Sequence, residues 1–100
     1  MIDITDSQAE LYRMIDRARA VRLTVMDDVA LVRGKDGEVS HCVRRLGKNT
    51  FICSCPGFAF SKLSANGHPL CKHVIALLMR DGIPLEERLK SLVPITAIEV

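Results

Sequence analysis

Three of the four cysteines and two of the three histidines of this 100-residue chain lie in residues 53–73. Four of them form two closely spaced pairs, Cys53-x-Cys55 and Cys71-x-His73, separated by fifteen residues. Thiolates and imidazoles are donors that Zn²⁺ binds tetrahedrally, and Cys₃His is an established structural set. These residues therefore predict one structural Zn²⁺ ion as the cofactor, with Cys53, Cys55, Cys71 and His73 as its ligands.

The spacing within each pair predicts the local structure that presents it. On an extended strand, residues i and i+2 point to the same side, so Cys53 and Cys55 can bind one ion. Inside a helix, residues at this spacing diverge by about 200°. We therefore expect Cys71 to cap a helix and His73 to lie in its first turn. Four protein ligands leave no open coordination position, which indicates a structural site and a protein that is not an enzyme.

The same residues allow three other interpretations. They could be buried thiols, a redox pair, or a cysteine nucleophile with a histidine base. A redox pair needs an exposed thiolate of low pKa, which bound zinc would suppress. A Cys71–His73 catalytic pair leaves Cys53 and Cys55 unexplained, so zinc binding remains the hypothesis that uses all four residues.

His68 and Cys42 are two further residues that could belong to the site. His68 lies in the turn "NGHP", where a histidine is more often solvated, or placed beside a metal ligand, than a ligand itself. Cys42 lies on the opposite face of a predicted strand from Val43, so we expect it to pack in the core or at an interface.

An amphipathic helix is predicted over residues 7–21. Leu11, Met14, Ile15 and Ala18 recur there at helical spacing and give the helix one apolar face. Only 4% of the residues are aromatic, so the core must be built mainly from aliphatic side chains, which bury less surface each. A zinc ion would help to stabilise such a core.

The remainder of the chain predicts an α+β fold in a single domain over residues 1–100. Residues 22–55 contain three alternating or β-branched segments separated by the turns "GKDG" and "LGKN", which indicate a three-stranded antiparallel sheet. In the middle strand, Val39, His41 and Val43 share the face that we expect to be the core. A loop or short helical turn follows the strands. Next come the zinc-capped helix "CKHVIALLMR", ended by Gly82, and a short helix in "PLEERLKSLV".

Composition restricts where the protein works and what it binds. The N-terminus "MIDITDSQAE" does not resemble a secretory signal, and no apolar run approaches the roughly 18 residues of a membrane span. We therefore expect a cytoplasmic protein in a reducing compartment, without a membrane partner and without structural disulfides. A net charge of +2 is too small to indicate nucleic acid by itself.

The segments "CSCPGF" and "CKHVIALL" resemble the SWIM-type zinc finger, whose pattern is C-x-C-x(n)-C-x-H on a ββα arrangement. Pro56, Phe58, Lys72 and the aliphatic run after the final histidine are all typical of that family. With its upstream hairpin the resemblance covers residues 29–80. The helix in residues 1–22 and the helix and tail in residues 83–100 are extensions. His41 departs from the family, which often has an aromatic residue such as Tyr at this place.

The resemblance implies a non-catalytic module that acts in DNA transactions such as recombination or repair. SWIM fingers occur in helicases, transposases, ubiquitin ligases and small accessory proteins of recombinases, and they are thought to bind DNA or proteins. The implied partners are DNA and a protein such as a RecA-family recombinase.

Basic residues at the two turns and beside the zinc loop are the candidates for nucleic-acid contacts. They supply enough cations for five or six phosphate contacts, although acidic neighbours dilute the positive field. The seven residues are Arg33, Lys35, Arg44, Arg45, Lys48, Lys62 and Lys72.

The alternative is a protein-interaction adaptor or homo-oligomer that does not bind nucleic acid directly. The amphipathic helix and the apolar tail "LVPITAIEV" provide more hydrophobic surface than a zinc finger needs.

Overall fold

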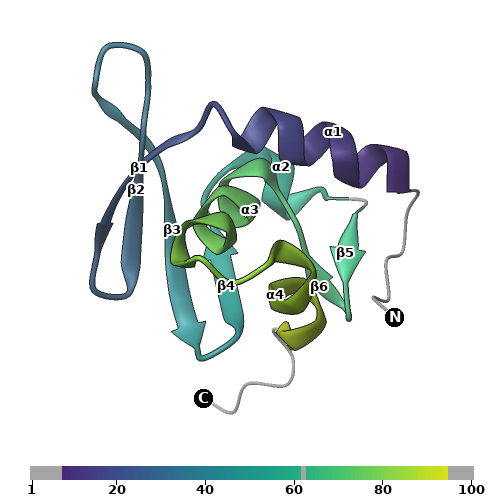
Figure 1. Ribbon diagram of the computed structural model, residues 1–100. Coiled ribbons are helices and arrows are strands. Elements are labelled where there is room, and N and C mark those ends of the chain that lie inside the picture. Colours follow the sequence, from purple (N-terminus) through teal and green to yellow (C-terminus); the bar gives the residue numbers. More distant parts are fainter. Residues whose placement is uncertain (1–7, 62, 95–100) are drawn as a thin grey trace.

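The computed structural model describes residues 8–61 and 63–94. The main antiparallel sheet has the helices gathered on one side of it (Figure 1). The sheet contains four strands in the order β1-β2-β3-β4, and a second sheet pairs β5 with β6. No helix in these described ranges is long and apolar enough to cross a membrane. In chain order the elements are α1 (Gln8–Ala18), β1 (Arg22–Met26), β2 (Val29–Arg33), β3 (Val39–Gly47), β4 (Thr50–Cys53), α2 (Pro56–Ala59), β5 (Ser64–Ala65), β6 (His68–Pro69), α3 (Lys72–Leu78), the 3₁₀ turn η1 (Met79–Asp81) and α4 (Leu85–Ser91).

The N-terminal helix α1 packs its predicted apolar face on the core. Leu11 and Ala18 are buried, and Met14 and Ile15 are partly buried against them. The helix packs against α3, so the two helices cover the same side of the sheet (Figure 1). The α+β class is confirmed, and α1 is part of the same core as the zinc region.

The prediction of three strands is wrong by one. The segment "RLTVMDDVALVR" is a hairpin, β1 and β2, whose turn consists of Asp27 and Asp28. Asp27 has φ 53°, in the left-handed region that Asn, Asp and Gly tolerate best. The turn lacks the Asn-Gly or Asp-Gly pair that marks most two-residue hairpins, so the local pattern does not indicate that the chain reverses here.

The core face of β3 matches the prediction only in part. Val43 is fully buried and lies opposite Ala30 of β2 and Cys53 of β4. Val39, predicted on the same face, is 47% exposed. The register between β2 and β3 shifts between Val32 and Arg33, and such an irregularity turns the end of the strand away from the regular alternation.

The segment between the two ligand pairs, predicted as a loop or short helical turn, contains that turn and a further hairpin. It starts with the single-turn helix α2, and β5 and β6 then form a hairpin around Asn66 and Gly67, with φ 52° and 80°. Both residues have positive φ, as a type I′ turn requires. The Asn66 side chain donates to the backbone carbonyls of Leu89 and Lys90, which fixes the hairpin against the end of α4.

The C-terminal elements begin and end near the predicted residues. Gly82, at φ 77°, ends the turn that follows α3, and Pro84 precedes α4. Beyond α4, the Val93 backbone N–H donates to Asn49, which brings this segment to the start of β4. The tail beyond residue 94, suggested above as an interaction surface, lies outside the described residues.

Candidate metal centre and basic groove

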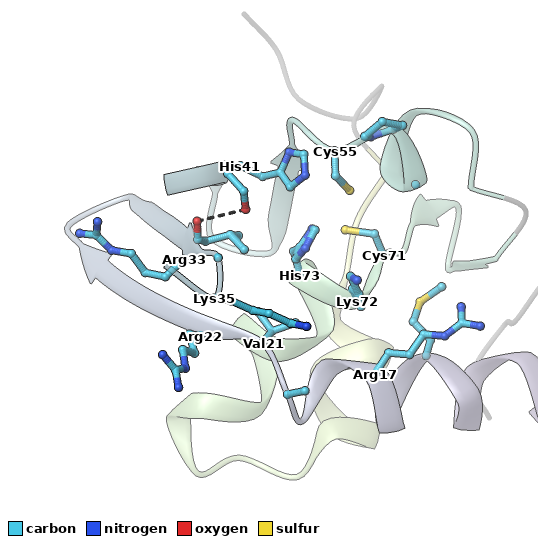
Figure 2. Close-up of a pocket in the computed structure, with 17 residues that line it drawn as sticks. Arg17, Val21, Arg22, Arg33, Lys35, His41, Cys55, Cys71, Lys72 and His73 are labelled. Carbon is cyan, nitrogen blue, oxygen red and sulfur yellow. Dashed lines mark hydrogen bonds between the residues drawn. The ribbon is translucent and has the colours of Figure 1, made fainter. Parts of the chain in front are cut away.

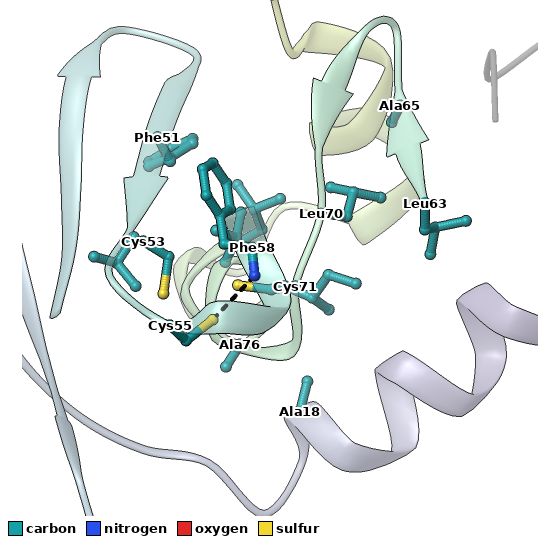
Figure 3. Close-up of a cluster of buried hydrophobic side chains, with 14 of the residues drawn as sticks. Ala18, Phe51, Cys53, Cys55, Phe58, Leu63, Ala65, Leu70, Cys71 and Ala76 are labelled. Carbon is teal, nitrogen blue, oxygen red and sulfur yellow. Dashed lines mark hydrogen bonds between the residues drawn. The ribbon is translucent and has the colours of Figure 1, made fainter. Parts of the chain in front are cut away.

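The four predicted zinc ligands converge from three elements. Cys53 is the last residue of β4, Cys55 is the N-cap of α2, Cys71 is the N-cap of α3, and His73 lies in the first turn of α3. All four side chains are buried, and their donor atoms lie within 4.8 Å of one another. The sulfur atoms of the three cysteines turn toward a common point (Figure 3). The expected cap position of Cys71 is confirmed.

The distance between donor atoms fits a zinc ion. The Cys53 Sγ lies 3.5 Å from His73 Nδ1. In a regular tetrahedron with Zn–S of about 2.3 Å and Zn–N of about 2.0–2.1 Å, the S···N edge is about 3.6 Å. The geometry therefore identifies Nδ1 as the donor atom of His73. One structural Zn²⁺ fits this Cys₃His cluster, and four protein donors fill its coordination shell.

The backbone prepares these sulfur atoms to carry negative charge. The Phe58 N–H donates to the Cys55 Sγ at 3.3 Å. The pKa of Cys53 is lowered chiefly by its hydrogen bond with Cys71 and further by a backbone hydrogen bond from Cys55. Hydrogen bonds of this kind orient ligand atoms and stabilise their charged form.

Hydrogen bonds and burial separate the pKa values of the three thiols. The hydrogen bond from Cys71 is the largest influence on Cys53 and lowers its pKa to about 4. The pKa of Cys71 is raised, first by that same hydrogen bond and then by burial. Burial, followed by the hydrogen bond with Cys53, raises the pKa of Cys55. Among the protein groups, the Cys53 thiolate forms most readily, and a bound dication would stabilise all three.

His68 is a core residue, which corrects the expectation of a solvated turn histidine or a neighbour of the metal. Its side chain is fully buried, and its Nε2 accepts a hydrogen bond from the Phe51 N–H at 2.9 Å. Its Nδ1 lies 2.6 Å from the Pro69 carbonyl, to which it donates when Nε2 is the acceptor. The ring packs edge-on against Phe51 and Phe58. Desolvation lowers the pKa of His68.

Cys42 lies on the outer face of the sheet and is partly buried. Its backbone N–H donates to the Ser54 hydroxyl. It is not among the grouped donor residues in the part of the chain that the structure describes.

The predicted nucleic-acid residues do not share one surface. Arg33, Lys35 and Lys72 line a groove beside the metal centre. Three others lie elsewhere: Arg45 forms an ion pair with Asp28, Arg44 is exposed on the outer face of β3, and Lys48 is exposed in the β3–β4 turn. Lys62 lies outside the described residues.

The groove beside the metal centre has a volume of about 850 Å³ and is basic. Arg17 of α1 and Arg22 of β1 join the three predicted residues in lining the groove. Lys35 and Lys72 lie beside His73, whereas the ends of the Arg22 and Arg33 side chains point away from it (Figure 2). None of the described residues that line the groove is acidic. Sequence reasoning missed both arginines, because only the packing of α1 on α3 brings them beside the zinc loop.

Within the described ranges, none of these five basic side chains forms an ion pair with a carboxylate. Five other basic residues in the same ranges do form such pairs. Arg33 donates to the Thr24 hydroxyl and the Gly37 carbonyl, which hold the guanidinium without neutralising it. The groove thus keeps its positive charge. The neutralised pairs are Arg13–Glu10, Arg19–Asp16, Arg45–Asp28, Arg88–Asp81 and Lys90–Glu86.

Comparison with known protein families agrees with this metal centre. Residues 53–82 match the family model of the SWIM zinc finger, and the match contains all four donors. This chain therefore carries a SWIM zinc finger with a Cys₃His site for one structural Zn²⁺. The hairpins upstream of Cys53, which we expected to belong to the finger from residue 29, lie outside the matched residues. No curated protein and no solved structure gave a match.

Proposed function

We propose that this protein is a non-catalytic zinc-binding module that acts in DNA transactions such as recombination or repair. It would bind the phosphate backbone of nucleic acid in the groove lined by Arg17, Arg22, Arg33, Lys35 and Lys72. The observation that carries this proposal is a groove with five cations and no acidic lining residue in the described chain. Such a surface attracts polyanions and releases their counterions on binding.

The lining of the groove favours contacts with phosphates over contacts with bases. The described lining residues contain neither phenylalanine nor tyrosine, which would stack on the bases of a single strand. The zinc contributes by fixing α3 and the α2 turn, which form one wall. Its closed shell supports a binding role and no catalysis. We expect the protein to work in a reducing compartment, where its thiols persist.

A matched pair of double variants tests this proposal. Lys35→Ala with Lys72→Ala removes two groove cations, while Arg44→Ala with Lys48→Ala removes two cations outside the groove. Binding of a fluorescent DNA duplex is measured by anisotropy at 0.1 M salt. Each phosphate contact contributes a slope of about −0.9 in log affinity against log salt, so at 0.1 M salt, one decade below 1 M, it strengthens binding by about 0.9 log unit. The groove variant loses two contacts and should therefore bind roughly 60-fold more weakly than the wild type. Equal losses in the two variants, or no binding by the wild type at low salt, would refute the proposal.

The outer face of the sheet supports a second candidate function, that of a protein-interaction adaptor. Met26 and Ile52 are 55% and 39% exposed there, next to the partly buried Val29 and Leu31. Arg44 lies opposite both Val29 and Ile52, so a cation stands in the middle of this apolar face. By charge complementarity, the fitting partner is a protein segment that combines apolar and acidic residues.

Site-specific crosslinking tests this second candidate. A photoreactive residue at position 52 should crosslink to an apolar, acidic peptide of another protein, and Arg44→Glu should abolish the product. A crosslink to a second copy of this chain would replace the adaptor with a homo-oligomer. The absence of any product that depends on Arg44 would remove this candidate.

A further inference from the structure

The imidazole ring of His73 lies between the metal centre and the basic groove. Its Nδ1 faces the donor cluster, 3.5 Å from the Cys53 Sγ, and the residue also lines the basic groove. A neutral imidazole that binds a metal through Nδ1 carries its proton on Nε2. Zinc at this site therefore fixes His73 as a hydrogen-bond donor through Nε2.

The Nε2–H of His73 lacks the partner that such a group normally has. Metal-binding histidines usually donate their second N–H to a carboxylate, a backbone carbonyl or a water molecule. Within the described chain, no protein acceptor is hydrogen-bonded to this nitrogen. His73 keeps 5% of its surface exposed and is one of the residues that line the groove. The acceptor can therefore come from whatever occupies the groove.

The surroundings of His73 favour an anionic acceptor. The His41 ring packs against the His73 ring with centroids 5.2 Å apart, so His73 is held between the metal cluster and a second ring. Lys35 and Lys72 line the same part of the groove (Figure 2). Three thiolates and Zn²⁺ leave a net charge of −1, and the two ammonium groups with Arg17 outweigh it.

We infer that the zinc-bound imidazole of His73 donates its Nε2–H to a non-bridging phosphate oxygen, with Lys35 and Lys72 on either side. This rests on the proposed function and deepens it, because it locates one phosphate of the backbone within the groove. It also gives the zinc ion a second role. The ion holds the proton on the nitrogen that faces the ligand, so the metal centre forms part of the anion site as well as of the fold.

The test observes the Nε2–H of His73 directly in the zinc-loaded wild-type protein, since replacing His73 would remove a ligand. The protein is labelled with ¹⁵N-histidine and titrated with a short DNA duplex, and separately with inorganic phosphate. We expect the Nε2–H resonance to shift and its exchange with water to slow in the presence of the duplex. The folded Lys35→Ala, Lys72→Ala variant should lose this response.

The possible outcomes separate this inference from the proposed function. If anisotropy shows duplex binding while the Nε2–H signal does not change, the phosphate contact is refuted and the proposed function stands. If phosphate shifts the signal but no duplex binds, the anion site is supported and the proposed function fails. If neither ligand changes the signal and no duplex binds, both are refuted.

Discussion

Replacing His68 by phenylalanine should destabilise the fold through two lost hydrogen bonds, without creating a cavity. The wild-type ring accepts from the Phe51 N–H and donates to the Pro69 carbonyl, and it is fully buried. Phenylalanine retains the ring but leaves both backbone groups unpaired. A buried polar group left without a partner costs about 1–3 kcal/mol, so the two unpaired groups should lower the free energy of unfolding by about 2–6 kcal/mol. That is a large part of the roughly 5–15 kcal/mol that stabilises a domain.

The pH dependence of this loss has a defined sign. Burial lowers the pKa of His68 below its ordinary value of 6.5, because desolvation disfavours the charged ring. The unfolded chain therefore binds this proton more readily than the folded chain. The contribution of His68 is complete above pH 6.5 and decreases as pH falls from 6.5 toward the lowered pKa, by at most about 1.4 kcal/mol per pH unit. The stability difference between wild type and His68→Phe should narrow as pH falls from 7.5 to 5.5, by no more than about 1.4 kcal/mol.

The assay is urea unfolding of the zinc-loaded proteins at several pH values and a fixed concentration of free Zn²⁺. Zinc release in acid affects both proteins, so their difference isolates His68. The control is His68→Gln, which retains an acceptor amide oxygen but does not titrate, and it should fall between the two. A His68→Phe variant as stable as the wild type, or a difference that does not change with pH, would refute this account of His68.

Two further predictions concern the metal and one turn. Complete removal of zinc by a chelator should abolish the helical circular-dichroism signal, because structural zinc contributes roughly 10–16 kcal/mol, and adding Zn²⁺ should restore it; an unchanged spectrum from metal-free protein would contradict a structural role. Gly67→Ala should lower the free energy of unfolding by about 1–2 kcal/mol, since φ is +80° there and the new Cβ would lie 3.1 Å from the Pro94 Cγ. Gly47→Ala is its control, because nothing lies within 4 Å of the added Cβ; equal losses in the two variants would contradict the strain.

Local sequence patterns were sufficient to predict the metal centre and several elements. The positions of Cys71 and His73 follow from the angle between residues two apart in a helix, and α1 follows from its period of apolar residues. Both depend on neighbours in the sequence. The turn at Asp27 was not predicted, because aspartate adopts the left-handed conformation there without the glycine that usually indicates such a turn.

Features that depend on contacts between residues far apart in the sequence could not be predicted from local patterns. "NGHP" correctly indicates a turn, but only the packing of Phe51 and Phe58 around His68 makes that histidine a core residue. Arg17 and Arg22 belong to the groove because α1 packs on α3. Equally, Arg45 is no better a candidate than other surface arginines once Asp28 pairs with it.

The salt dependence of DNA binding tests the central claim most directly, because it counts the phosphates that the groove contacts. Five cations should give a slope of log affinity against log salt of about −4.5, which is about a 500-fold loss between 50 and 200 mM salt. Lys35→Ala should reduce the slope to about −3.6, while Arg44→Ala should leave it unchanged. A wild-type slope near zero, or a slope that changes with Arg44 and not with Lys35, would contradict a nucleic-acid groove at this zinc centre.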